Sequence, residues 1–192
     1  PLPSNLFVIG TVNVDETTYQ FSPKVLDRAF SFEFRVASDE LDSAAQPPEA
    51  VAPGPAGGHH SLLTASRDTS FQLHHPAPEA AGVGEQLRDL HRALSEIGFE
   101  FGHRAHVEAM RFSSFLAIAG IEDADAALDW IVMTKILPRL HGSRRQLESF
   151  LNDLRATAEG VDAEKPVMPL TARKVARMLG LVRANQFVSF AE

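Results

Sequence analysis

The sequence predicts an α-rich protein in which a remnant of an α/β core precedes a mainly α-helical bundle. Residues 6–34 place a short apolar run, a helix start and an alternating run in succession, which is the order of elements in an α/β layer. From residue 85 onward, apolar residues recur at helical spacing in several stretches. Turn-forming residues separate these two regions. We therefore divide the chain into a core segment (1–36), a flexible insertion (37–84), a helical bundle (85–158) and a C-terminal helix with a short strand (159–192).

The core segment predicts two strands and a helix. Residues 6–9 form an unbroken apolar run, which indicates a buried central strand, and the polar residues Thr11, Asn13 and Asp15 follow it. Ser22-Pro23 supplies a capping hydroxyl and a residue suited to a first helical turn, so a short helix is expected over residues 24–29. A second strand with one buried face is expected next, because three phenylalanines alternate with polar residues: Phe30, Phe32 and Phe34.

The insertion is rich in proline and glycine and has too little apolar periodicity to order itself, so we expect it to be mobile. It contains two histidine pairs, His59-His60 and His74-His75, which are candidate metal ligands. Both pairs lie in a loop without cysteine or a carboxylate cluster, whereas metal sites need ligands on rigid elements. We expect no metal site in this chain.

The second half predicts five helices. They are expected over residues 85–97 with Gly98 as the stop, from about 102 to 116, over 124–137 with Pro138 closing the helix, over 144–156 after Gly142-Ser143, and over 171–183. A short strand at 187–190 follows. Trp130 is expected to pack inside the bundle. The apolar residues expected to face inward are Leu87, Leu90, Leu94, Ile97, Leu128, Ile131, Val132, Ile136, Leu137, Leu147, Phe150, Leu151 and Leu154.

Composition excludes several classes of protein. The 192 residues are 44% hydrophobic and 22% charged, which is ordinary for a globular chain. A net charge of −7 argues against binding nucleic acid by bulk electrostatics. The lack of cysteine excludes a disulfide scaffold and thiolate metal sites, and it fits a reducing cytoplasm. No run of eighteen apolar residues occurs, so no membrane association is expected.

The core segment resembles part of the AAA+ ATPases, and within them the group of McrB-like restriction motors, MoxR proteins and dynein-related ATPases. Three strings carry the resemblance: Gly10-Thr11-Val12-Asn13, Asp15-Glu16-Thr17 and residues 21–29 with the sequence FSPKVLDRA. They are similar to the sensor-1 strand and the arginine-finger helix of that group. Residues 85–154 are similar to its helical lid. The resemblance covers residues 6–36 and about 85–154 and leaves the insertion unexplained.

The resemblance implies roles for three residues. Asn13 would be the sensor-1 amide that orients the attacking water, and Arg28 the finger that reaches a neighbouring subunit's nucleotide. Arg104 would be a sensor-2-like residue that contacts the γ-phosphate. From the residues alone, Asn13 can equally cap a turn, Arg28 can lie on a solvated helix face, and Arg104 can pair with a carboxylate of its own helix, either Glu100 or Glu108.

A basic cluster is a further candidate site. Its side chains surround a Pro-Gly turn, where they can meet the phosphates of a nucleotide or of DNA, form a solvated face, or make a contact between subunits. No aromatic residues alternate with them, which argues against stacking on single-stranded nucleic acid. The cluster consists of Lys135, Arg139, His141, Arg144 and Arg145.

The phosphate-binding loop of such ATPases is missing. No Gly-x-x-x-x-Gly-Lys-Ser/Thr occurs, and none of the twelve glycines precedes a lysine. The acidic pairs Asp15-Glu16 and Asp39-Glu40 do not directly follow four unbroken apolar residues as a magnesium-binding pair would, and both lie at or after the sensor strand. We expect that pair to precede Pro1, so that this chain is either the C-terminal portion of a longer protein or a truncated gene product.

The resemblance therefore implies a part of an enzyme: the sensor, finger and lid half of a hexameric ring that hydrolyses ATP or GTP with Mg²⁺. Such a ring would drive a restriction-type DNA-processing or remodelling complex with a nuclease partner subunit, and its contact with DNA would be indirect unless the basic cluster described above binds DNA. The alternative is a non-catalytic interaction module that associates with related AAA+ subunits.

We predict that the isolated chain neither hydrolyses nor tightly binds ATP or GTP, because the loop that offers backbone N–H groups and a lysine to the phosphates is absent. Isothermal titration calorimetry on the purified chain measures this directly. Nucleotide binding at micromolar concentration would contradict the prediction.

Overall fold

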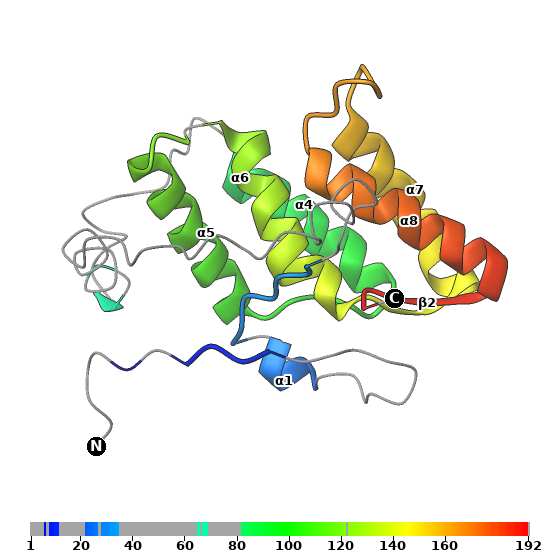
Figure 1. The fold of residues 1–192 in the computed structure, drawn as a ribbon, viewed down its shortest axis with the longest axis horizontal. Coiled ribbons are helices and arrows are strands. Elements are labelled where there is room, and N and C mark those ends of the chain that lie inside the picture. Colours follow the sequence, from blue (N-terminus) through cyan, green and yellow to red (C-terminus); the bar gives the residue numbers. More distant parts are fainter. Residues whose placement is uncertain are drawn as a thin grey trace, which may run out of the picture.

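The computed structural model describes residues 6, 8–11, 22–26, 28–34, 65, 67–68, 82–121 and 123–191 (Figure 1). The first element is the short helix α1 (Pro23–Leu26). The bundle consists of α4 (Val83–Glu96), α5 (His103–Ile118), α6 (Ala124–Ile131), the π-helical η4 (Val132–Ile136), the 3-10 turn η5 (Leu137–Arg139), β1 (His141–Ser143), α7 (Arg144–Glu159), α8 (Pro169–Asn185) and β2 (Phe187–Ser189). The described chain is therefore rich in helix, as the sequence predicts.

Four of the five predicted helices of the bundle are confirmed, as α4, α5, α7 and α8, and the fifth is confirmed in its first part, as α6. Helix α4 begins two residues before its predicted start, and the chain leaves it at Gly98, whose φ of 76° is readily available only to glycine. The predicted inner stripes of α6, η4 and α7 are also confirmed, because each of these side chains is buried: Leu128, Ile131, Val132, Ile136, Leu137, Leu147, Phe150, Leu151 and Leu154.

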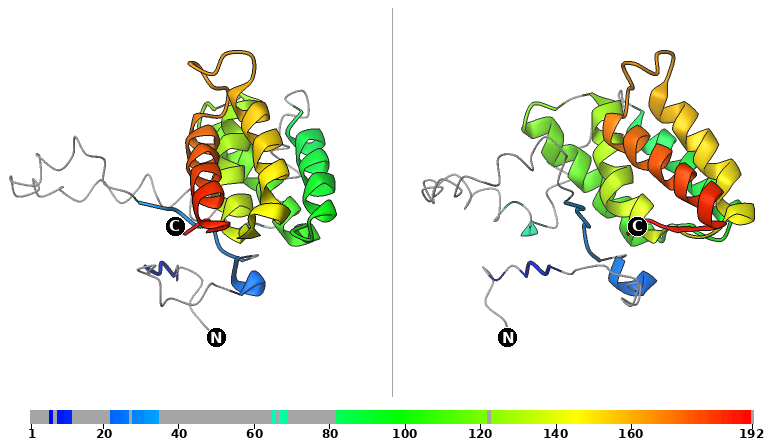
Figure 2. Two further views of the ribbon diagram at one scale, coloured as in Figure 1. Left: turned by 90° about the vertical axis from the view of Figure 1, so that its right-hand side faces the viewer. Right: turned by 45° about the vertical axis from the view of Figure 1, so that its right-hand side comes forward.

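Helices α7 and α8 form the most extensively packed pair of the bundle, and the views in Figure 2 show them side by side. A two-stranded antiparallel sheet joins the ends of this pair, with His141 opposite Ser189 and Ser143 opposite Phe187. One hydrophobic core extends from Val83 on α4 to Phe190 after β2. The C-terminal helix and strand thus share a core with the preceding helices.

Between α6 and α7 the chain changes its helical pitch. The predicted single helix over 124–137 becomes a π-helix at Val132 and a 3-10 turn at Leu137, and Pro138 within that turn has no N–H to continue an α-helix. The Thr134 hydroxyl donates to the Trp130 carbonyl at 2.7 Å. The expectation that Trp130 packs inside the bundle is wrong: it is 39% exposed, because its neighbours Leu128 and Ile131 occupy the inner face.

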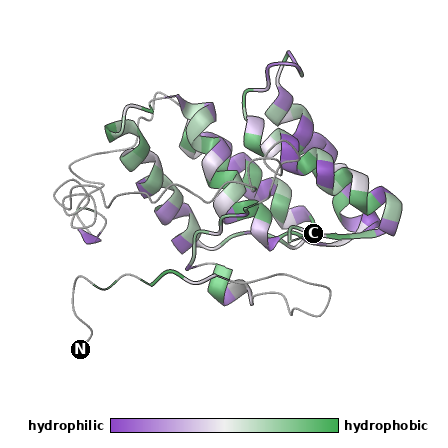
Figure 3. Ribbon diagram, viewed as in Figure 1, coloured by the Kyte–Doolittle hydropathy of each residue, from purple (hydrophilic) through white to green (hydrophobic). Residues whose placement is uncertain are grey.

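The inner face of α5 is made of small residues, which the sequence analysis did not anticipate. Ala105, Ala109 and Ser113 are buried, whereas Val107 is exposed. Residues four apart lie on one face of a helix, and small side chains on that face allow neighbouring helices to approach closely. Hydropathy also changes along the length of α5, whose first half is mainly hydrophilic and whose second half is mainly hydrophobic (Figure 3).

Neither expected strand of the core segment is present among the described residues. Val8 and Ile9 are 87% and 91% exposed, so the predicted buried strand at 6–9 is wrong for the residues described there. In the second predicted strand the exposed and half-buried positions are reversed, since Phe34 is 94% exposed whereas Glu33 faces the bundle. The predicted helix forms, as α1, but it is shorter than the predicted 24–29.

The insertion lies almost wholly outside the described residues, as do its histidine pairs. Among the residues that the structure describes, no helix combines the length and the apolar character that crossing a membrane would require.

A buried carboxylate holds the start of α8. Asp129 on α6 is 3% exposed, and its two oxygens accept the backbone N–H groups of Leu170 at 2.9 Å and Thr171 at 2.7 Å. The first helical residue, Pro169, has no N–H to satisfy. The carboxylate therefore covers the first free donors of the helix and also interacts favourably with the positive end of its dipole.

We predict that Asp129→Ala lowers the free energy of unfolding by about 2–4 kcal/mol, because two buried N–H groups lose a charged acceptor. Urea denaturation followed by far-ultraviolet circular dichroism measures the change. The exposed carboxylate of Asp153 on α7 provides the control, and Asp153→Ala is expected to change stability by no more than about 0.5 kcal/mol. Similar losses in both variants would contradict the assigned role of Asp129.

Candidate functional site

Arg28 lies in the turn that directly follows α1. Its backbone N–H donates to the Val25 carbonyl at 3.0 Å, which makes it part of the last turn of the helix. Its side chain is exposed. The Arg28 guanidinium is therefore exposed to solvent at the end of a short helix.

The residues after Arg28 are fixed to the bundle by polar contacts. The Ser31 N–H donates to the Thr134 carbonyl at 3.0 Å. The Glu33 carboxylate accepts two hydrogen bonds from the Lys174 ammonium, at 2.8 and 2.9 Å, and Lys174 also donates to the Phe190 carbonyl. We call residues 30–33 the anchor segment, because these contacts hold it to η4 and α8.

An aromatic contact completes the anchor. The Phe30 ring lies 5.3 Å from the Phe112 ring on α5, and the Lys135 ammonium lies 4.3 Å from the Phe30 centroid. Lys135 is 1% exposed and pairs with the Glu108 carboxylate. A buried ammonium requires such partners, since its desolvation is otherwise very unfavourable. Arg28 therefore lies two residues before Phe30, whose ring is held against Phe112 and Lys135.

Arg104 lies in the first turn of α5 and its side chain is 59% exposed. Its Nε is 3.8 Å from the Glu108 carboxylate, at the long end of an ion pair. One of the local pairings that the sequence allowed is therefore present. Glu108 also binds Lys135, so this single carboxylate connects Arg104 with the lysine that contacts Phe30. Asn13, the third predicted site residue, lies outside the described residues.

Most members of the basic cluster serve the fold. Lys135 is buried against Glu108, and Arg139 is 9% exposed with its Nη1 3.5 Å from the Glu100 carbonyl. Burial lowers the pKa of the Arg139 guanidinium. The His141 ring contacts the Arg139 carbonyl through Nδ1 at 3.0 Å.

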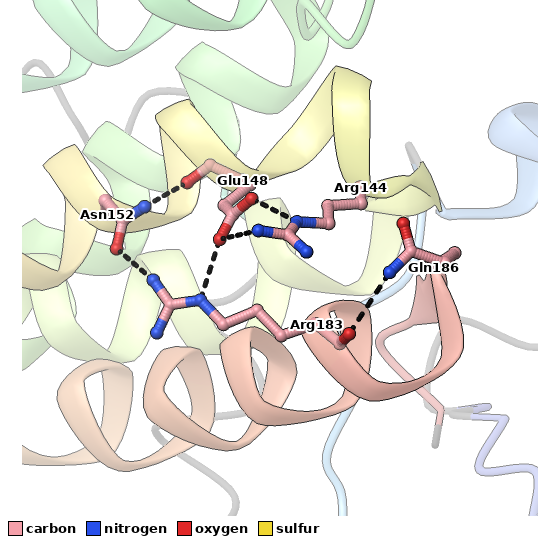
Figure 4. A network of polar contacts seen from close by, with 5 residues as sticks. All are labelled: Arg144, Glu148, Asn152, Arg183 and Gln186. Atoms are coloured by element: carbon pink, nitrogen blue, oxygen red, sulfur yellow. Dashed lines mark hydrogen bonds and ion pairs between the residues drawn. The ribbon is translucent and has the colours of Figure 1, made fainter.

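Arg144, another member of the cluster, belongs to a network that joins α7 to α8 (Figure 4). The Glu148 carboxylate accepts from Arg144 at 2.5 Å and from Arg183 at 2.7 Å. Arg183 also donates to the Asn152 side chain at 3.0 Å, and Gln186 donates to the Arg183 carbonyl at 3.2 Å. The two arginine hydrogen bonds lower the pKa of Glu148. Arg145 remains as an exposed member of the cluster.

The sequence analysis missed the two side chains that hold the anchor segment and the start of α8. Lys174 lies within the buried stripe of α8, between Thr171 and Val175, and Asp129 lies next to Leu128 on the inner side of α6. A charged residue on an otherwise apolar face is itself a signal, because burial requires a partner of opposite charge or a set of hydrogen bonds. The identity of those partners cannot be inferred from helical spacing.

Within the described part of the chain, no three His, Cys, Asp or Glu side chains gather in a way that would hold a metal ion.

A comparison with protein families finds one match. The model of a domain of unknown function, DUF8727, matches residues 65–187, which span the whole of α4 to α8 and more than half of the chain. No curated protein and no solved structure matches the chain.

We predict that Glu33→Ala lowers the free energy of unfolding by about 3 kcal/mol, because it leaves the ammonium of Lys174, which is 5% exposed, without its carboxylate. The Ser31 amide should also exchange its hydrogen faster, since the anchor segment loses its strongest contact. Denaturation and hydrogen exchange measure the two effects.

Arg173→Ala is the matched control, because Arg173 is the exposed neighbour of Lys174 on α8. It should leave both measurements nearly unchanged. An unaltered Ser31 amide in Glu33→Ala would show that the ion pair does not hold the anchor segment.

Proposed function

The chain belongs to the DUF8727 family, and we propose that it forms the C-terminal part of a ring-forming AAA+ NTPase. In this proposal, Arg28 on the turn after α1 is the arginine finger, and the bundle from α4 onward is the lid. The complete protein would use ATP or GTP with Mg²⁺. Hydrolysis in a hexameric ring would drive a restriction-type DNA-processing or remodelling complex, with a nuclease as partner subunit.

The placement of Arg28 is the observation that supports this proposal best. A finger that acts on a neighbouring subunit needs a guanidinium free to leave its own surface and a backbone stiff enough to aim it. Arg28 is exposed, and Phe30 and Ser31 are held to the bundle immediately after it. A solvated surface arginine needs no such support.

A chain of contacts also leads from Arg104 to Phe30, two residues after Arg28. Arg104 pairs with Glu108, Glu108 binds the buried Lys135, and Lys135 lies over the Phe30 ring. If Arg104 contacts a nucleotide, a shift of its helix would displace this carboxylate and, through Lys135, the anchor segment. The bundle could thus couple the nucleotide bound at one subunit to the finger offered to the next.

A second candidate function is a non-catalytic module that only associates with related subunits. It is favoured by the exposed apolar side chains of the N-terminal segment, since Ile9, Phe32 and Phe34 are 91%, 57% and 94% exposed. Apolar side chains exposed in this way are available for contact with a partner. Arg28 distinguishes the two candidates, because only the first requires its guanidinium.

In the complete protein, we predict that Arg28→Ala leaves folding and nucleotide binding nearly intact and lowers hydrolysis by about a thousandfold or more, as loss of an arginine finger does. Mixing with a second variant that keeps Arg28 but lacks its own phosphate loop should restore part of the activity, because one competent interface then forms in a mixed ring. Steady-state phosphate release measures both effects.

Lys24→Ala is the control for this experiment, because Lys24 is an exposed cation on the same short helix. It should keep nearly full activity. If mixed rings assemble but no activity returns, Arg28 does not act in trans, and the interaction module becomes the better explanation.

For Asn13 we predict a different kinetic signature in the complete protein. An amide that positions water contributes to transition-state alignment more than to ground-state binding, so Asn13→Ala should lower turnover by about ten- to a thousandfold at nearly constant nucleotide affinity. Equal losses of affinity and turnover would indicate a structural role for Asn13.

A further inference from the structure

A groove opens between α4 and the start of α5. It has a volume of about 540 Å³. Neither Arg28 nor Arg104 lines it, so it is distinct from the contacts proposed for those residues. The residues that line the groove are Leu87, Arg88, His91, Arg92, Ser95, Phe101, Gly102, His103 and His106.

All ionisable side chains that line this groove are basic. Two arginines and three histidines face it, and no carboxylate is among the lining residues, although the chain carries a net charge of −7. Asp89 pairs with Arg92 at 2.8 Å from outside the lining. The two guanidinium groups, together with any protonated imidazole, repel one another, which favours an anionic ligand between them.

The repulsion is reflected in the titration of His106. Burial lowers the pKa of this imidazole, and the nearby Arg88, His103 and His91 lower it further. A second histidine, His91, makes an edge contact with the Phe101 ring, with the ring centroids 5.0 Å apart. This contact holds the His91 imidazole at the groove. An anion bound between these side chains would offset their mutual repulsion.

The backbone supplies further donors. Helix α5 begins after Gly102, and no side chain caps its first turn. The free N–H groups of that turn and the positive end of the helix dipole lie beside the histidines. The groove therefore combines guanidinium, imidazole and backbone donors at one place.

We propose that this groove binds a phosphate group, either as free phosphate or diphosphate or as the phosphate of a nucleotide. A tetrahedral oxyanion offers several acceptor oxygens in different directions, which suits donors that come from two helices and a helix terminus. Arg88 is its principal charge partner, because Arg92 already pairs with Asp89. This proposal does not depend on the AAA+ function of the chain.

The first test titrates the full chain with inorganic phosphate and then with diphosphate at constant ionic strength. Calorimetry gives the affinity, and the histidine side-chain signals in nuclear magnetic resonance spectra give the location. We expect dissociation constants on the order of a millimolar, with tighter binding of diphosphate, and shifts at His91, His103 and His106.

Arg88→Ala should weaken binding by about tenfold or more, the effect of losing one charge-assisted hydrogen bond. His103→Gln keeps a side-chain N–H donor but cannot take up a proton, and it should weaken binding less. Arg173→Ala removes an exposed arginine from α8, outside the groove, and should leave the affinity unchanged. Absence of phosphate binding, or equal affinities in the Arg88 and Arg173 variants, would overturn the proposal.

The second test uses sulfate, whose charge does not change between pH 8 and pH 6. The groups that face the bound ion are Arg88, His91 and Arg92 from α4 and His103 and His106 from α5. The anion favours protonated imidazoles, so its affinity should rise as the pH falls through this range. An affinity independent of pH would show that the histidines do not contact the ion and would overturn the proposal.

The source of the phosphate is distinguished by comparing adenosine with adenosine monophosphate. If the monophosphate binds like inorganic phosphate and adenosine does not bind, the groove recognises the phosphate alone. If the monophosphate binds more tightly than inorganic phosphate, a nucleotide is the ligand. Equal binding of adenosine and its monophosphate would mean that the phosphate is not recognised, and the proposal would be wrong.

Discussion

The buried ammonium of Lys174 is the constraint on which the arrangement of the N-terminal segment depends. Lys174 is one of the least exposed charged residues described, and a lysine in that position requires an anionic partner. Glu33 supplies it from a part of the chain 141 residues away. Once Glu33 is held, the backbone hydrogen bond of Ser31 and the contacts of Phe30 follow along the same short segment, and Arg28 is placed beside the bundle.

A second consequence concerns the division of charge within the bundle. The acidic groups Asp129, Glu108 and Glu148 are each engaged with donors from other elements, so the bundle uses its carboxylates to join helices. The groove between α4 and α5 has no such carboxylate in its lining and keeps a local positive field in an acidic protein. This basic lining is the basis of the phosphate site that we propose there.

Helical periodicity was sufficient for most of the bundle because the burial of an amphipathic helix is a local property of the sequence. The stripe of Leu147, Phe150 and Leu151 predicts the inner face of α7 whatever its neighbours are. The same kind of inference was wrong for residues 30–34. Alternation shows that two faces differ, but it does not show which face the protein covers. Here the bundle offers a lysine and a carbonyl to the polar face, and the phenylalanines at 32 and 34 are exposed.

The sequence by itself determined most of the bundle's helices and the inner stripes of α6 and α7. The lack of a phosphate loop is also evident from the sequence. All of these features follow from the spacing and identity of the residues alone. The pairing of β1 with β2, the capping of α8 by Asp129 and the attachment of Glu33 to Lys174 were decided only by tertiary structure, because each joins residues at least 41 positions apart. The same holds for the basic groove, whose arginines and histidines come from two helices. Such partners are determined by which polar groups are buried together in three dimensions, and they cannot be inferred from the spacing of residues along the chain.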